Sequence, residues 1–190
     1  MELRSILRTS VGLAASLALL LFFASPVMKA QTADSEDISK LLTEAENHAV
    51  LAVDDAATLE SYTRSSASWQ IHSDKVVQIV EHINALGKVN KQLNDLSPQG
   101  SPWQQKAISQ IDSLLRDTAA QLSATINHLR DNQSRIHQQP YIDYAHGNYE
   151  RASRTAQMIS DFVEYDKAKS KVDALEEKLQ LSDAEKADKS

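Results

Sequence analysis

The 190-residue sequence has no cysteine, and this absence excludes several kinds of chemistry. Disulfides, thiolate zinc sites, iron–sulfur clusters, thiol nucleophiles and covalently attached c-type haem all require that side chain. A lipid anchor on a cysteine at the end of an export signal is excluded for the same reason.

Turn-forming and aromatic residues are also scarce. The chain has four glycines and four prolines, and aromatics make up 5% of it. An all-β protein needs many turns and normally contains more glycine and proline than this. Alanine, leucine, glutamine, lysine, glutamate and serine are frequent instead, and this composition is typical of long helices. The composition therefore predicts an all-α protein.

Basic charge is in deficit. The formal net charge is −6, and removing residues 1–30 makes it more negative. Nucleic acids and anionic membrane surfaces bind dense basic stripes, which this chain lacks. We therefore expect neither nucleic acid nor a membrane surface as a partner.

Residues 1–30 have the order of a secretory signal peptide. Arg4 and Arg8 precede the uncharged, leucine- and alanine-rich run 11–24, and Ala30 is a small residue at a plausible cleavage point. The run is shorter than the ~20 residues of a comfortable membrane span. We expect a bacterial protein exported to the periplasm or exterior, with no membrane attachment after cleavage. An uncleaved membrane anchor is the alternative.

Apolar residues recur at steps of three and four along four segments, which predicts four amphipathic helices. These segments are residues 36–62, 68–96, 102–132 and 140–181. In the fourth the pattern weakens after Tyr165, although Val172, Leu175 and Leu179 prolong it.

Short connections between long helices force antiparallel neighbours, so the prediction is an up-down-up-down four-helix bundle. The bundle spans residues 36–181. It follows a polar linker, 31–35, and precedes a charged flexible tail, 182–190, that is poor in apolar residues.

Several helix boundaries carry recognisable signals. Ser35 can cap the first helix, and prolines 98 and 102 with Gly100 mark a loop. Ser101 and Gln104 fit a capping box around a helix that starts with proline. The turn at 62–68 lacks glycine and proline, and a single bent helix over 36–96 is the alternative there.

Histidines are the only residues that suggest a metal or haem site. His72 lies on the apolar stripe of the second helix, and His48 and His128 flank the stripes of the first and third. Facing histidines in a bundle core can bind a transition metal or haem iron. However, the chain has no Glu-x-x-His pair of the ferritin-like kind, and we favour the interpretation that His72 is a hydrogen-bonded interior residue and the others are partly exposed. We expect no metal or cofactor.

Two aromatic groups are candidates for an interaction surface. Trp103 follows the proline-rich loop, and Tyr141, Tyr144 and Tyr149 lie near the start of the fourth helix. Aromatic residues with a polar atom are common at interfaces. The alternative is that they close the two ends of the core. In the predicted bundle the two groups lie at opposite ends.

Patterns of catalytic residues are absent from the sequence. It contains no glycine-rich phosphate loop, no Gly-x-Ser-x-Gly turn and no His-Glu-x-x-His. We therefore predict a protein without enzymatic activity.

The segments SWQIHSDKVVQIVEHINALGKVNKQL, SPWQQKAISQI and NHLRDNQSRIH resemble a family of small exported all-helical proteins from soil-type bacteria. The resemblance covers roughly residues 40–165. It implies an exported helical fold, and because the family has no assigned activity, it implies no site.

These observations together favour an exported, non-enzymatic bundle with a binding or structural role in the bacterial envelope. Its partner is an unknown protein or a second copy. One alternative is a periplasmic carrier of metal or b-type haem that uses the core histidines. Another is a chaperone-like protein for exported chains.

Overall fold

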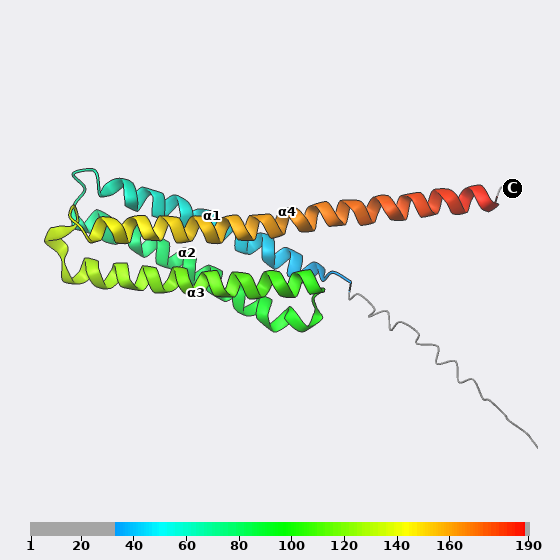
Figure 1. Ribbon diagram of the computed structural model, residues 1–190, viewed down its shortest axis with the longest axis horizontal. Coiled ribbons are helices and arrows are strands. Elements are labelled where there is room, and N and C mark those ends of the chain that lie inside the picture. The colour runs from blue at the N-terminus through cyan, green and yellow to red at the C-terminus, as the bar shows by residue number, and fades with distance from the viewer. Residues whose placement is uncertain (1–32, 189–190) are drawn as a thin grey trace, which may run out of the picture. The chain divides into compact units, whose positions relative to one another are not determined.

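The computed structural model describes the backbone of residues 33–188 and the side chains of residues 33–180. Four α-helices account for most of this part of the chain, and it contains no strand (Figure 1). They are α1 (Glu36–Tyr62), α2 (Trp69–Leu96), α3 (Pro102–Asp131) and α4 (Tyr141–Asp188). Short 3-10 turns, η1 (Ser97–Gln99) and η2 (Gln133–Arg135), lie in the two later connections. The all-α prediction is confirmed.

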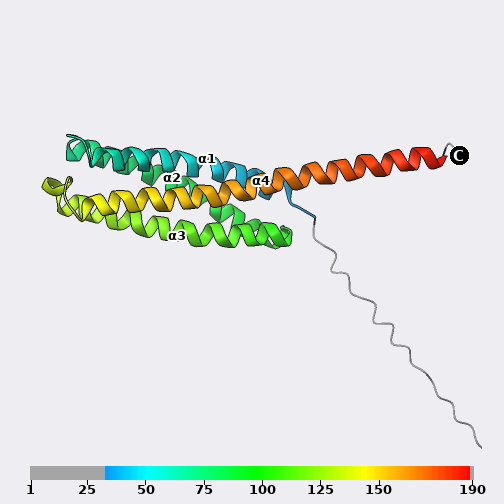
Figure 2. The ribbon, with the colours of Figure 1, turned by 45° about the horizontal axis from the view of Figure 1, so that its top comes forward.

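The helices form the predicted antiparallel four-helix bundle. Helix α1 packs against α2 and α4, and α3 packs against α4 and α2, so each helix contacts the neighbours that precede and follow it around the bundle. Figures 1 and 2 show the four helices side by side from two directions. The predicted stripes form the core.

Small side chains allow α1 to lie close to its neighbours. Its buried stripe contains four alanines, each at most 1% exposed: Ala45, Ala49, Ala52 and Ala56. Larger residues of the other helices are buried in the same core, among them Ile79, Leu86 and Ile159. This alternation of small and large residues produces a dense core.

A side-chain capping bond is present at the start of α1 but not at the start of α2. The Ser35 hydroxyl accepts a hydrogen bond from the backbone N–H of Ile38, and Glu36 and Asp37 lie in the first turn, where the helix dipole favours acids. Ser68 is at the N-cap of α2 with extended backbone, but its side chain makes no capping bond. The turn at 63–68 therefore separates α1 from α2, and the single bent helix is excluded.

Gln104 joins the starts of α1 and α3. Its side chain is fully buried, and its Oε1 accepts hydrogen bonds from the backbone N–H of Ser35 (2.9 Å) and of Ser101 (3.1 Å). Its Nε2 donates to the carbonyl oxygen of Ser35 (2.9 Å). The expected capping residue therefore also bonds across the bundle, and Ser35, the last residue of the predicted linker, is held in place.

Helix α4 is much longer than the other helices, with 48 residues against 27, 28 and 30. Its regular burial ends at Val163, and every residue from 171 to 180 is exposed. The bundle therefore ends well before residue 181, where the sequence analysis placed its boundary. Figures 1 and 2 show α4 continuing past the ends of its neighbours. We call residues 166–188 the arm.

The predicted tail, 182–190, has no helix boundary at its start, because α4 continues to Asp188. The sequence here contains alanine and lysine twice each and has neither glycine nor proline, so nothing in it breaks the helix. Residues 189–190 lie outside the described part.

The predicted signal peptide, residues 1–30, and the first two linker residues also lie outside the described part of the chain. Within that part, no helix combines the length and apolar character that a membrane crossing requires.

Candidate functional site

A cluster of histidines and tyrosines fills the end of the bundle where α1 meets α2 and α3 meets α4. His72 and Tyr141 are both fully buried, and His72 Nδ1 lies 3.1 Å from the Tyr141 hydroxyl. The His72 ring also makes edge contacts with Tyr62 and His137, with ring centroids 5.7 Å and 5.8 Å away. We call these residues the aromatic cluster, together with His128, which stacks on Tyr141 at 6.0 Å.

Burial keeps the centre of this cluster uncharged. It lowers the pKa of His72, and the nearby His137 lowers it further. Burial also raises the pKa of the Tyr141 hydroxyl well above its ordinary value. At neutral pH His72 is therefore a neutral imidazole hydrogen-bonded to a neutral phenol, which suits a structural core contact.

The three histidines proposed for a metal do not form one group. His48 lies beside His82, with ring centroids 6.4 Å apart, where α1 packs against α2. His82 in turn faces Asp55, with Nε2 3.3 Å from Oδ2. His128 shares Tyr141 as a neighbour with His72, whereas the imidazole beside His72 is that of His137.

Among the described residues, no group of three or more histidines, aspartates or glutamates has the arrangement of a metal site. His137 was not a sequence candidate. It lies in the connection between α3 and α4, where no helical period indicates which way a side chain points.

The four aromatic residues proposed as an interaction surface lie in different environments. Tyr141 cannot contribute to an exposed surface, because it is fully buried at the centre of the aromatic cluster. Tyr144 is half-buried against His128, with ring centroids 5.1 Å apart. Tyr149 is half-buried beside the core. Tyr141 and Tyr144 instead fit the alternative, in which the tyrosines close the end of the core.

Trp103 lies at the opposite end of the bundle and is also partly buried. Its Nε1 donates a 2.7 Å hydrogen bond to Asp34 Oδ1, and its ring makes an edge contact with Tyr165 at 5.1 Å. Lys169 Nζ lies 3.0 Å from the other oxygen of Asp34. These contacts join the residues before α1 to the point where α4 leaves the bundle.

The electrostatics at this junction favour ionised side chains. Burial opposes the charge of Asp34, but nearby donors from Ser101, Lys169 and Trp103 outweigh it, so the pKa of Asp34 lies below its ordinary value. Hydrogen bonds to Asp173 and Asp34 raise the pKa of Lys169. Asp34 and Lys169 are therefore charged across the neutral range.

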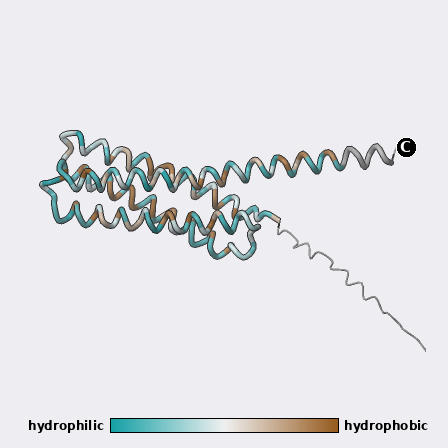
Figure 3. Tube along the Cα trace, viewed as in Figure 1, coloured by the Kyte–Doolittle hydropathy of each residue, from teal (hydrophilic) through white to brown (hydrophobic). Residues whose placement is uncertain are grey.

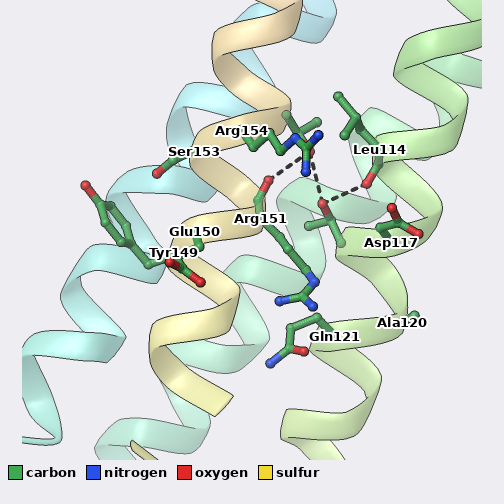
Figure 4. Close-up of a pocket in the computed structure, with 11 residues that line it drawn as sticks. Leu114, Asp117, Ala120, Gln121, Tyr149, Glu150, Arg151, Ser153 and Arg154 are labelled. Atoms are coloured by element: carbon green, nitrogen blue, oxygen red, sulfur yellow. Dashed lines mark hydrogen bonds between the residues drawn. The ribbon is translucent and has the colours of Figure 1, made fainter. Parts of the chain in front are cut away.

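A groove of about 950 Å³ runs between α3 and α4 (Figure 4). At its floor the hydroxyls of Thr118 and Thr155 are 3.0 Å apart, and further along the interface the Asn148 amide donates to the Thr125 hydroxyl. The groove is polar and carries both signs of charge. Its lining residues are Leu114, Asp117, Thr118, Ala120, Gln121, Tyr149, Glu150, Arg151, Ser153, Arg154 and Thr155.

The groove offers no obvious catalytic pairing. Each threonine hydroxyl is also 2.9 Å from a carbonyl oxygen of its own helix, that of Thr118 from Leu114 and that of Thr155 from Arg151. Because a hydroxyl has one proton, one threonine donates to its carbonyl and accepts from the other threonine, which donates across the interface. The lining residues include no histidine, so neither hydroxyl has an imidazole base within the groove to activate it. The bonds join α3 to α4 and fit a structural role.

The last part of α4 carries a row of exposed apolar side chains, which we call the seam: Tyr165, just before the arm, and Val172, Leu175 and Leu179 within it. They are 51%, 52%, 52% and 65% exposed. Figure 3 shows hydrophobic positions recurring along this part of α4 between hydrophilic ones. The sequence analysis included three of these residues in the helix pattern but assigned them to the core, because it did not anticipate that the other helices end earlier.

Comparison with protein-family models, with curated proteins and with solved structures finds no match to this chain.

Proposed function

We propose that the protein is an exported, non-enzymatic binding or structural protein of the bacterial envelope. The bundle is a rigid support, and the arm is the surface through which it contacts a partner. The seam carries this proposal, since it places four large apolar side chains about half exposed along one helix. Single exposed apolar residues are ordinary, but a row of them on one helix is typical of an interaction site.

Export rests on the pattern of residues 1–30, and secretion of a fusion tests it. The chain fused to alkaline phosphatase, which is active only outside the cytoplasm, should give active enzyme and appear in the osmotic-shock fraction. Deletion of the run 11–24 is the control and should abolish both signals. An inactive fusion protein that remains in the cytoplasmic fraction would contradict the envelope assignment.

Use of the arm is tested by cross-linking in living cells. A photoreactive amino acid at Val172 or Leu175 should give a discrete adduct, whereas the same amino acid at Ala174 or Glu177 should give little. All four positions are exposed, so only the seam distinguishes them. Equal yields at the four positions would overturn the proposal. A broad range of unfolded exported proteins in the adducts would favour the chaperone-like alternative.

A periplasmic metal carrier is the second candidate, favoured by one observation. His72 Nε2 is buried and makes no hydrogen bond of regular geometry among the described residues, although the Tyr62 backbone is close to the ring; the His137 ring lies 5.8 Å away. If this pair binds metal, equilibrium dialysis with Zn²⁺ or Cu²⁺ should give one ion per chain. His137→Ala should remove binding and His146→Ala, at an exposed position, should not. Less than one tenth of an ion per chain would exclude the carrier.

A further inference from the structure

The seam has the spacing of a coiled coil. Tyr165, Val172, Leu175 and Leu179 follow one another at intervals of seven, three and four residues, and Ala168 occupies the position between the first two. This alternation fits the a and d positions of a heptad, with Tyr165, Val172 and Leu179 at a, and Ala168 and Leu175 at d. The arm is therefore suited to pack along another helix.

Three residues of the seam, Val172, Leu175 and Leu179, face away from the bundle, whereas Tyr165 contacts Trp103 of the same chain. At about 100° per residue, Val172, Leu175 and Leu179 lie roughly 160–220° around the helix axis from Ile159, which is fully buried in the core. The chain's own α1 and α3 therefore lie on the opposite side of α4. Within the described residues, the bundle cannot cover Val172, Leu175 and Leu179 without a large change in the helix, so we infer an occupant from another chain.

Charges beside the seam point to the identity of that chain. In a parallel pair of helices, each g residue lies beside the e residue five positions later on the partner. Lys171 and Glu176 stand in this relation, and so do Glu164 and Lys169. When two copies align in register, both pairs have opposite charges, but Lys169 already contacts Asp34 and Asp173 of its own chain, so the argument rests on Lys171 and Glu176. Among the described residues neither Lys171 nor Glu176 makes a salt bridge within the chain.

We propose that the occupant is a second copy of this chain, bound through a parallel, in-register coiled coil of the two arms. This inference rests on the proposed use of the arm as a contact surface and adds the partner. An antiparallel pair with Val172 opposite Leu175 brings Lys171 of one chain beside Lys178 of the other, which is unfavourable.

The arm is short for a coiled coil, but its helix is already formed. Isolated helices of about 12–15 residues are marginal in water because nucleation is costly. Here the packed half of α4 supplies the nucleus, and the arm only propagates it. We therefore expect a reversible dimer whose population depends on protein concentration.

The first test is sedimentation equilibrium of residues 31–190, which form one compact unit. The protein should show a monomer–dimer equilibrium. Leu175→Glu should raise the dimer dissociation constant at least tenfold, because the substitution places a charge in the seam of both copies. Ala174→Glu adds the same charge on a different side of the arm and should change the dimer dissociation constant less than twofold. Equal effects of the two variants, or a monomer at every concentration, would overturn the inference.

Charge reversal tests the partner and the orientation together. Lys171→Glu and Glu176→Lys should each weaken self-association, because each places like charges together across the dimer. The two single variants mixed should form a heterodimer at least as tight as the wild-type dimer, and the double variant should recover association. Lys167→Glu and Glu177→Lys, on the outer side of the arm, should leave association unchanged.

Failure of this inference differs from failure of the proposed function. If the purified chain stays monomeric but the cross-linker at Leu175 captures a different envelope protein, the arm is a contact surface and the proposal of a second copy as its partner is wrong. If neither self-association nor seam-specific adducts occur, the proposed use of the arm and the proposed dimer are both wrong. Single variants that weaken the dimer without recovery on mixing would overturn the parallel arrangement.

Discussion

The two parts of α4 share one helix but differ in what surrounds them. From Tyr141 to Val163 the helix presents a regular buried stripe to α1 and α3, whereas residues 171–180 are exposed on every side. The backbone does not change at the boundary; the neighbouring helices end. The comparison shows that helix length and burial have separate causes, because local propensity sets the first and the length of the neighbours sets the second.

The largest expected effect contrasts one residue from each part. Ile159→Ala should lower the free energy of unfolding by about 2–5 kcal/mol, because it removes fully buried methylene groups and leaves a cavity. Leu175→Ala should change it by less than about 0.5 kcal/mol in the monomer, since Leu175 is half exposed. Urea unfolding at low protein concentration measures both. Similar losses would mean that the arm packs on its own bundle.

A smaller effect is expected at the first turn of the packed part. Tyr141→Phe removes the hydroxyl next to His72 Nδ1 and leaves a buried ring nitrogen without its partner, at a cost of about 1–3 kcal/mol. Tyr144→Phe is the matched control, because the contact of Tyr144 with His128 is made by its ring. In chemical denaturation, the free energies of unfolding of the two variants should differ by at least about 1 kcal/mol. Equal values would show that the contact between the Tyr141 hydroxyl and His72 does not stabilise the fold.

The same cluster should make the packed part sensitive to acid. The pKa of His72 is lowered in the folded protein from its ordinary value of 6.5, so below that pH the unfolded chain binds more protons. The stabilising effect of the neutral ring is complete above pH 6.5 and is lost as the pH falls toward the folded pKa. Melting temperatures from pH 7.5 to 5 should decline, and less steeply in His72→Gln. An NMR titration midpoint for His72 at or above 6.5 would contradict the assignment.

The smallest effect is expected where the two parts of α4 meet. Asp34→Asn weakens the bonds to Trp103 and Lys169, and because these groups are partly exposed the loss should be below about 1 kcal/mol. Hydrogen exchange should nevertheless quicken in residues 165–170 more than in the middle of α4. Unchanged exchange there would show that Asp34 does not hold the base of the arm.

Much of the bundle could be predicted because its signals are local. The start of α1 follows from Ser35, Glu36 and Asp37, and the steps of three and four identified the buried face of each helix before any contact was known. The end of the bundle was not predictable in this way. Val172, Leu175 and Leu179 continue a helical period, but only the lengths of α1, α2 and α3 decide that nothing of this chain covers them.

The polar contacts of the core were harder to predict, because each joins residues far apart in the sequence. Gln104 was identified as a capping residue from its distance to Ser101, but its bonds to Ser35 cross 69 positions. His72 was correctly placed on the core stripe, whereas its neighbour His137 lies in a connection without a period. The sequence suggests which side chains are buried, and the fold decides which of them meet.

The side chain of Gln104 has a consequence for how the bundle opens. One oxygen atom accepts hydrogen bonds from the backbone N–H groups of two N-cap residues, Ser35 and Ser101, which come from distant parts of the sequence. If either helix start frays, that oxygen loses a donor and the remaining bond is exposed to water. The two ends should therefore fray together, as a single cooperative unit.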